Sequence, residues 1–162
     1  MTNHVHLIAV PAEEKSLALG VGEAHRRYTR CVNFREGWRG YLFQGRSHSF
    51  PLDGGYLLAA VRYVLRNPVR AGLVRRPWGY RWSSAKWFVG ERRDDPLAAP
   101  SDMLARITDR RAFLLQDDDS LTEFRKHART GRPLGSESFL MQLEQSTGRA
   151  LRPKRRGPKP AR

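Results

Sequence analysis

The stretch DGGYLLAAVRYVLRNP at residues 53–68 carries the strongest structural signal in the chain. Its leucines and valines recur at helical spacing, so they form one apolar stripe. Asp53 can cap the start of a helix, because its side chain can accept hydrogen bonds from the first backbone N–H groups. Proline restricts the residue before it, so the Asn67–Pro68 step predicts the end. We therefore predict an amphipathic helix between Asp53 and Asn67.

Upstream of this helix, strand-like and helical segments alternate. Residues 4–10 (HVHLIAV) are apolar and β-branched and stop at Pro11, which predicts a strand. Residues 16–36 show helical periodicity. Residues 41–50 (YLFQGRSHSF) again favour a strand. The N-terminal part therefore predicts a mixed α+β architecture.

Downstream, an aromatic and basic loop at residues 75–88 (RRPWGYRWSSAKWF) gives way to helical patterns. Ser136 is placed to cap the last of these helices. The predicted helices cover residues 101–107, 110–116, 120–129 and 136–147. We divide the chain into a first domain over 1–94, a helical region over 95–148 and a disordered tail over 149–162.

Composition excludes several classes of protein. Of the 162 residues, 40% are hydrophobic and 10% aromatic, which excludes a wholly disordered chain. The single cysteine excludes a disulfide framework and a cysteine-rich zinc module. No apolar run reaches the ~20 residues of a membrane span, and no secretory signal pattern is present. We expect a cytoplasmic protein that has no membrane partner.

The net charge of +14 indicates a polyanionic partner. Residues 1–94 contribute +9, residues 95–148 contribute −2 and residues 149–162 contribute +7. The last segment (RALRPKRRGPKPAR) has no acidic residue, so it can neutralise phosphates. The alternative is a tail that only aids solubility.

Two pairs of side chains have spacings that suit chemistry. On a strand, His4 and His6 project from the same face and can share a divalent metal ion. On a helix, Tyr63 and Asn67 lie one turn apart. Tyrosine can act as a nucleophile towards phosphorus, and an amide oxygen is a possible metal ligand. Taken alone, each pair also fits a structural role: a polar strand face for the histidines, and a packed tyrosine before a helix end.

Several stretches together resemble one family. Residues 3–7 (NHVHL) resemble the histidine motif of the HUH single-strand DNA transposases, and residues 63–74 (YVLRNPVRAGLV) resemble the signature of the REP-associated tyrosine transposases. Residues 42–46 (LFQGR), 82–84 (WSS) and 131–136 (GRPLGS) resemble further motifs in the family's order. The resemblance therefore extends over nearly the whole chain.

The resemblance implies a fold and a reaction. It implies a ferredoxin-like antiparallel sheet with helices, followed by a C-terminal helical region and a basic tail. It implies that His4, His6 and Asn67 hold Mg²⁺ or Mn²⁺, and that Tyr63 is the catalytic nucleophile of a DNA endonuclease and strand transferase. The product would be a 5′-phosphotyrosine at a palindromic, REP-type site.

Relative to the family, the chain begins at the histidine motif, so the resemblance implies a sheet that lacks its first strand and helix. An unpaired sheet edge favours aggregation. We therefore expect poor soluble expression of this chain.

The expected partner is single-stranded or hairpin DNA, bound by a monomer or a homodimer. Arginines that flank the tyrosine can clamp phosphate, and aromatic rings among cations suit unpaired bases. We expect Trp82 in the core and leave the roles of Trp78 and Tyr80 open. The candidate DNA-binding residues are Arg66, Arg70, Arg75, Arg76, Arg81, Lys86, Lys154, Arg155 and Arg156.

Two other functions compete with this interpretation. A non-catalytic DNA-binding remnant of such a transposase would use the same basic surfaces without cleavage. A metal phosphohydrolase would use an activated water molecule, but it would need carboxylates near the histidines.

Overall fold

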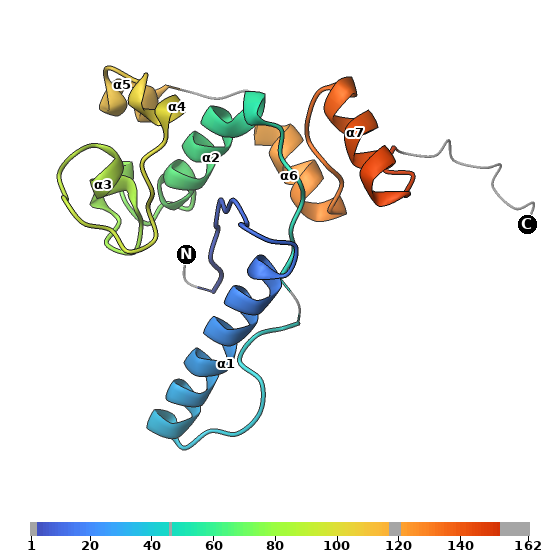
Figure 1. The fold of residues 1–162 in the computed structure, drawn as a ribbon. Helices are drawn as coiled ribbons and strands as arrows, with labels where there is room; N and C mark the ends of the chain where they lie inside the picture. Colours follow the sequence, from blue (N-terminus) through green and yellow to red (C-terminus); the bar gives the residue numbers. More distant parts are fainter. Residues whose placement is uncertain (1–2, 46, 117–120, 153–162) are drawn as a thin grey trace, which may run out of the picture. The chain divides into compact units, whose positions relative to one another are not determined.

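The computed structural model describes residues 3–45, 47–116 and 121–152, and their regular elements are helices (Figure 1). The chain divides into two compact units. One unit comprises Met1–His6 with Phe50–Arg162, and the other comprises Leu7–Ser49. The proposed boundaries at residues 94 and 148 remain predictions, and residues 153–162 of the tail lie outside the described residues.

The Leu7–Ser49 unit is built on one long helix, α1 (Ser16–Glu36), which confirms the helix predicted there. It ends where Gly37 takes a positive φ of 66° and its backbone N–H donates to the carbonyl of Asn33. The following loop returns along the helix: the Asn33 amide donates to Gly40 O at 2.9 Å, and Phe43 stacks on His25.

The other unit is organised around α2 (Leu57–Arg70). Asp53 caps a single 3-10 turn, η1 (Gly54–Tyr56), that leads directly into α2. The helix does not stop before Pro68 as the sequence predicts. It continues to Arg70, and just beyond this end the N–H groups of Ala71 and Leu73 donate to the carbonyls of Asn67 and Pro68.

Helix α2 packs on two sides, against α5 and against α6 (Figure 1). One buried cluster joins Val61 and Leu65 to Ala85, Phe88 and Leu114. The other joins Ala60 to Phe124 and Leu134. The elements that supply the first cluster are η2 (Pro77–Gly79), α3 (Ala85–Phe88), α4 (Asp102–Ala105) and α5 (Arg110–Leu115); α6 (Leu121–Thr130) supplies Phe124 to the second.

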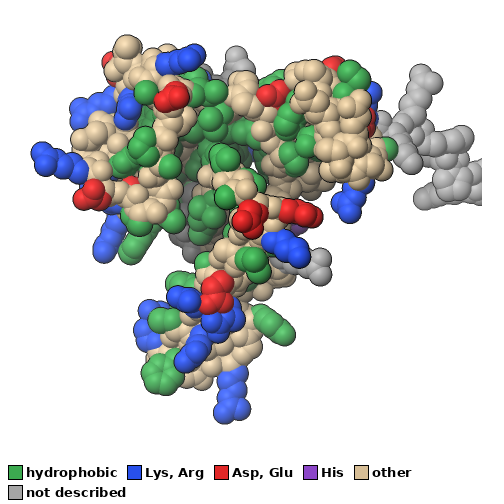
Figure 2. Space-filling view, viewed as in Figure 1, with side chains coloured by type: hydrophobic (Ala, Val, Ile, Leu, Met, Phe, Trp, Pro, Cys, Tyr) green, Lys and Arg blue, Asp and Glu red, His purple; other side chains and the backbone are tan. Residues whose placement is uncertain are grey.

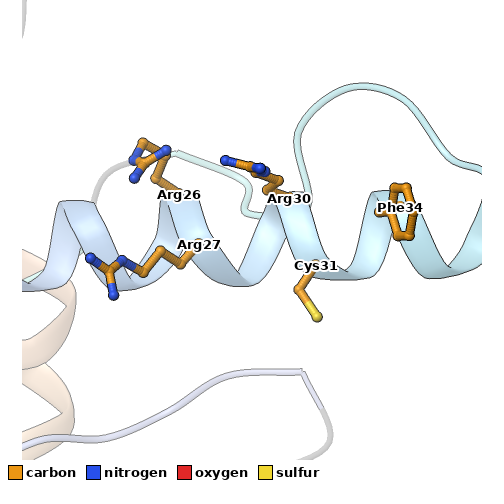
Figure 3. A pocket seen from close by; sticks show the side chains of 5 residues that line it. All are labelled: Arg26, Arg27, Arg30, Cys31 and Phe34. Atoms are coloured by element: carbon orange, nitrogen blue, oxygen red, sulfur yellow. The ribbon is translucent and has the colours of Figure 1, made fainter.

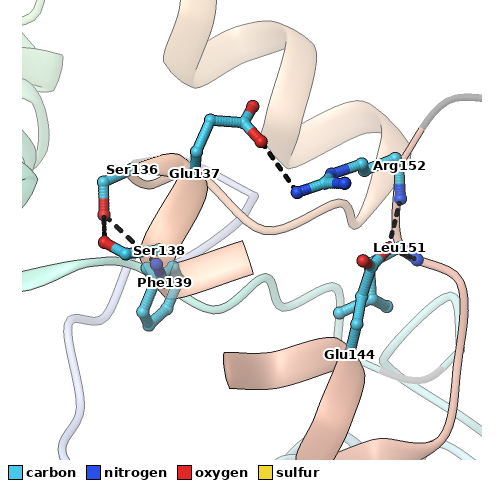
Figure 4. A network of polar contacts seen from close by, with 7 residues as sticks. All are labelled: Ser136, Glu137, Ser138, Phe139, Glu144, Leu151 and Arg152. Atoms are coloured by element: carbon cyan, nitrogen blue, oxygen red, sulfur yellow. Dashed lines mark hydrogen bonds and ion pairs between the residues drawn. The ribbon is translucent and has the colours of Figure 1, made fainter. Parts of the chain in front are cut away.

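The last helix, α7 (Glu137–Thr147), starts at Ser136 as predicted, since the Ser136 hydroxyl accepts from the N–H of Phe139. Asp53 in turn accepts from the backbone N–H and the hydroxyl of Ser136, at 3.1 and 2.8 Å. Figure 4 shows how the chain after α7 is held: Glu144 accepts from the N–H of Leu151, and Arg152 pairs with Glu137.

The prediction of a ferredoxin-like antiparallel sheet is wrong. The described residues contain no strand, and their one isolated bridge, between Leu52 and Leu134, is parallel. Residues 4–10 and 41–45 are irregular, and Val5 and Val10 are 75% and 93% exposed. The physical reason is that a β-branched segment forms a strand only beside a pairing partner, and no described segment provides one.

Within the described parts of the chain, no helix combines the length and the apolar character that crossing a bilayer requires.

Candidate active site around Tyr63

The two histidines of the N-terminal motif lie side by side although their segment is not a strand. Their Nε2 atoms are 3.1 Å apart and their rings meet edge to face. Two nitrogen ligands of one ion, each at about 2.1 Å from it, are separated by about 3.0–3.4 Å at common coordination angles. His4 Nδ1 also donates to Asn3 Oδ1 at 2.7 Å, which leaves its Nε2 as the ligand atom. This pair therefore fits two positions of a metal centre.

His6 is half-buried, and its surroundings favour the neutral imidazole. Burial lowers the pKa of His6, and the neighbouring His4 ring and the positive charge of Arg70 lower it further. A metal ligand must be in the same unprotonated form. The electrostatics of the site and the ligand role therefore agree.

The ring of Tyr63, on α2, is in contact with three other side chains. The edge of His6 meets its ring at 5.9 Å between centroids, with the planes at 89°. Phe124 from α6 stacks on it at 5.3 Å, with the planes at 26°. The guanidinium carbon of Arg70 lies over the ring at 4.3 Å. Tyr63 is thus contacted by side chains from the histidine motif, from the end of α2 and from α6.

Arg70 links the two polar residues predicted one turn apart on α2. Its Nη2 donates to the carbonyl oxygen of Tyr63 at 2.9 Å and to Asn67 Oδ1 at 3.2 Å. The amide oxygen predicted to be a third metal ligand therefore accepts a hydrogen bond from Arg70 in this structure. Coordination by Asn67 remains a prediction.

The described residues contain no group of three His, Cys, Asp or Glu side chains placed to hold a metal ion. An amide such as that of Asn67 is outside that set of residue types. His6 is in ring contact with Tyr63 and His4 with His6, and their role as metal ligands remains a prediction.

The candidate DNA-binding residues differ in their surroundings. Arg66 is tied to the end of α5, because its guanidinium donates to the carbonyl oxygen of Gln116. Arg75, Arg76 and Arg81 are exposed around η2, and Lys86 on α3 is partly exposed. No ion pair joins any of these last four to another described residue. Lys154, Arg155 and Arg156 lie outside the described residues.

The prediction that Trp82 belongs to the core is wrong. Trp82 is 74% exposed, and the guanidinium of Arg81 lies 4.5 Å from its ring centroid. The prediction assumed a sheet above the tryptophan, and no such sheet is present in the described chain. Trp78 instead packs against the first cluster and is partly buried.

The helix α1 carries a separate basic hollow, lined by Arg26, Arg27, Arg30, Cys31 and Phe34 (Figure 3). Glu23 pairs with the first two arginines at 2.7 Å each, and these bonds lower the pKa of Glu23 to about 2. Figure 2 shows Lys and Arg side chains at many separate places on the visible face. The residues around Tyr63 are therefore a candidate site because of their side-chain types and contacts, and not because charge is concentrated on the surface there.

Comparison with protein-family models, with curated proteins and with solved structures finds no match for this chain. Phe124 is the site residue that the sequence did not indicate, since nothing in its spacing connects it to Tyr63.

Proposed function

We propose that this chain is a metal-dependent DNA strand transferase in which Tyr63 attacks a scissile phosphate. The observation that carries the proposal is the histidine pair, with its Nε2 atoms 3.1 Å apart, directly beside the Tyr63 ring. Tyrosine can act as a nucleophile towards phosphorus, and a metal ion held by the two imidazoles would stabilise negative charge on the phosphate oxygens.

The chemistry assigned to Tyr63 is a reversible exchange of phosphate esters. The phenol oxygen forms a bond to phosphorus and the phosphorus–O3′ bond breaks. The phenol proton passes to solvent, and the leaving O3′ takes a proton from solvent. A 5′-phosphotyrosine and a free 3′-hydroxyl result. The reverse attack of the 3′-hydroxyl rejoins the strand, because the ester conserves the energy of the original bond.

His4 and His6 would hold the metal ion, Mg²⁺ or Mn²⁺, with Asn67 as the proposed third ligand. When bound, such an ion stabilises negative charge on the phosphate oxygens. Arg70 adds a cation whose position is set by its hydrogen bonds to Tyr63 O and Asn67 Oδ1. A positive group fixed before the reaction needs little reorganisation when charge develops.

The proposed substrate is single-stranded or hairpin DNA with a REP-type palindrome, met in the cytoplasm. The exposed ring of Trp82 offers a surface on which an unpaired base can stack, and the exposed arginines around η2 suit the phosphates beside it. The competing proposal is a protein that binds the same DNA without cutting it. Both proposals accommodate a monomer or a homodimer.

The test is covalent capture of DNA. The full chain is incubated with a labelled single-stranded palindrome and Mn²⁺, and the mixture is separated under denaturing conditions. We expect a covalent adduct that Tyr63→Phe and a chelator each abolish, whereas Tyr56→Phe, on the neighbouring turn η1, leaves it intact.

An adduct formed by Tyr63→Phe would contradict the assignment of the nucleophile. DNA binding without any adduct from the unsubstituted chain would favour the non-catalytic alternative.

A further inference from the structure

We infer that α6 is a wall of the candidate active site, and that Phe124 is a positioning residue that fixes the ring of Tyr63. This inference rests on the proposed function for its consequence in catalysis. It assigns a role to a helix that the sequence placed in a separate C-terminal region.

Phe124 is placed to restrict the tyrosine. It is only 2% exposed and stacks on Tyr63 at 5.3 Å, with 26° between the ring planes. Arg70 lies over the same tyrosine ring at 4.3 Å, and the His6 ring makes an edge-to-face contact with it. A ring held by a stacked neighbour, a cation and an edge contact has few orientations that preserve all three.

The position of Phe124 is itself fixed by the chain that follows α6. Gly131 N–H donates to His127 O at 2.8 Å, and the His127 ring nitrogen Nδ1 donates to Arg132 O at 2.9 Å. These bonds close the turn after the helix.

Leu134, in the same buried cluster as Phe124, then ties that turn to the segment that leads into α2. Its N–H donates to Pro51 O, and its carbonyl accepts from Asp53 N–H, both at 2.9 Å. α6 is thus anchored at the start of the helix that carries Tyr63, so a shift of Phe124 would break this packing.

The consequence concerns the rate of the chemical step rather than DNA affinity. An in-line attack on phosphorus requires the phenol oxygen to be aimed along the bond that breaks. A displacement of about 1 Å in such a geometry costs on the order of a hundredfold in rate. Because Phe124 is only 2% exposed, its side chain is not available to DNA, so its loss should lower the rate at saturating DNA and leave the binding constant unchanged.

The chain offers a matched control for this test. Phe88 is also 2% exposed, but it belongs to the cluster on the other side of α2. Phe124→Leu and Phe88→Leu therefore remove the same ring from equally buried sites. Phe124→Tyr keeps a ring to stack on Tyr63, and Phe124→Met replaces the leucine variant if the latter does not fold.

Adduct formation is followed in single turnover as a function of DNA concentration, with the full chain. We expect Phe124→Leu to lower the limiting rate tenfold or more at an unchanged DNA dissociation constant, and Phe124→Tyr to restore it. Phe88→Leu is expected to match Phe124→Leu in thermal destabilisation and to keep the limiting rate. An unchanged rate in Phe124→Leu, or an equal loss in Phe88→Leu, would overturn the inference while the adduct itself still supports the proposed function.

A spectroscopic measurement tests the positioning without any activity. Stacking on Phe124 shifts the NMR resonances of the Tyr63 ring, which are assigned by comparison with Tyr63→Phe. We expect this shift to vanish in Phe124→Leu and to persist in Phe88→Leu. If the Tyr63 resonances are the same in both variants, Phe124 does not hold the ring, whether or not the chain cuts DNA.

Discussion

The two sides of α2 differ in the side chains that pack against them. On one side, Val61 and Leu65 are buried with Phe88 and Leu114, and every member of that cluster is hydrophobic. On the other side, the small Ala60 leaves room for Phe124, and the half-buried Tyr63 packs beside it. Both sides bury apolar side chains, and the second side also carries Tyr63, the proposed nucleophile.

This difference shows how one amphipathic helix can serve both stability and chemistry. Tyr63 lies two residues after Val61, so the helical turn places these two side chains on different sides of α2. Substitutions on the first side should therefore change only the free energy of unfolding, whereas substitutions around Tyr63 should change the reaction as well. The following predictions test that division.

The largest effect is expected for Leu114→Ala. Leu114 is completely buried in the first cluster, and truncating a buried leucine costs about 2–5 kcal/mol through lost burial and the cavity left behind. Denaturant unfolding measures this loss. The NMR resonances of the Tyr63 ring should stay where they are in the folded variant. A loss of stability below about 1 kcal/mol would mean that this cluster does not carry the fold.

A smaller effect, on binding alone, is expected for Trp82→Ala. Trp82 is exposed outside the first cluster, so its removal should leave the unfolding free energy unchanged. A stacked base contributes about 1–3 kcal/mol to single-strand binding, and the affinity for single-stranded DNA should fall accordingly.

Phe34→Ala is the control for Trp82→Ala, because Phe34 is another exposed aromatic side chain, 91% exposed on α1. Equal affinities for the unsubstituted chain and Trp82→Ala would show that bases do not stack there.

The helices that the sequence predicts are present in the structure, whereas the strands that it predicts are absent from the described residues. The reason is physical. Helical hydrogen bonds are local, so the periodicity of residues 16–36 and the cap at Ser136 were sufficient to locate α1 and the start of α7. Strand bonds connect distant segments, so the β-branched residues of 4–10 predicted a strand that has no partner among the described residues.

The candidate site divides in the same way. The proximity of His4 to His6 follows from a spacing of two residues, and the link from Tyr63 to Asn67 follows from one helical turn closed by Arg70. The stacking of Phe124 on Tyr63 depends on how α6 packs against α2, and no local pattern encodes that contact. The exposure of Trp82 was missed because it depends on the absence of a covering sheet.

The smallest effect is expected at Asp53, whose side chain accepts hydrogen bonds both at the start of the segment leading into α2 and at the start of α7. The backbone N–H and the hydroxyl of Ser136 lower the pKa of Asp53 from its ordinary value of 3.8. A carboxyl whose pKa is lower in the folded state adds stability above its unfolded pKa, and this stability is lost as the pH falls through the folded value. Asp53→Asn should therefore be less stable than the unsubstituted chain near neutral pH, with a difference that shrinks below about pH 4. Ser136→Ala removes the hydroxyl donor together with the cap of α7 but keeps the backbone N–H, so it should show part of the same pH dependence. The test is to measure the unfolding midpoint of each chain from pH 7 to pH 3. If the midpoints of the unsubstituted chain and Asp53→Asn differ by the same amount at every pH, the carboxylate does not connect the starts of α2 and α7.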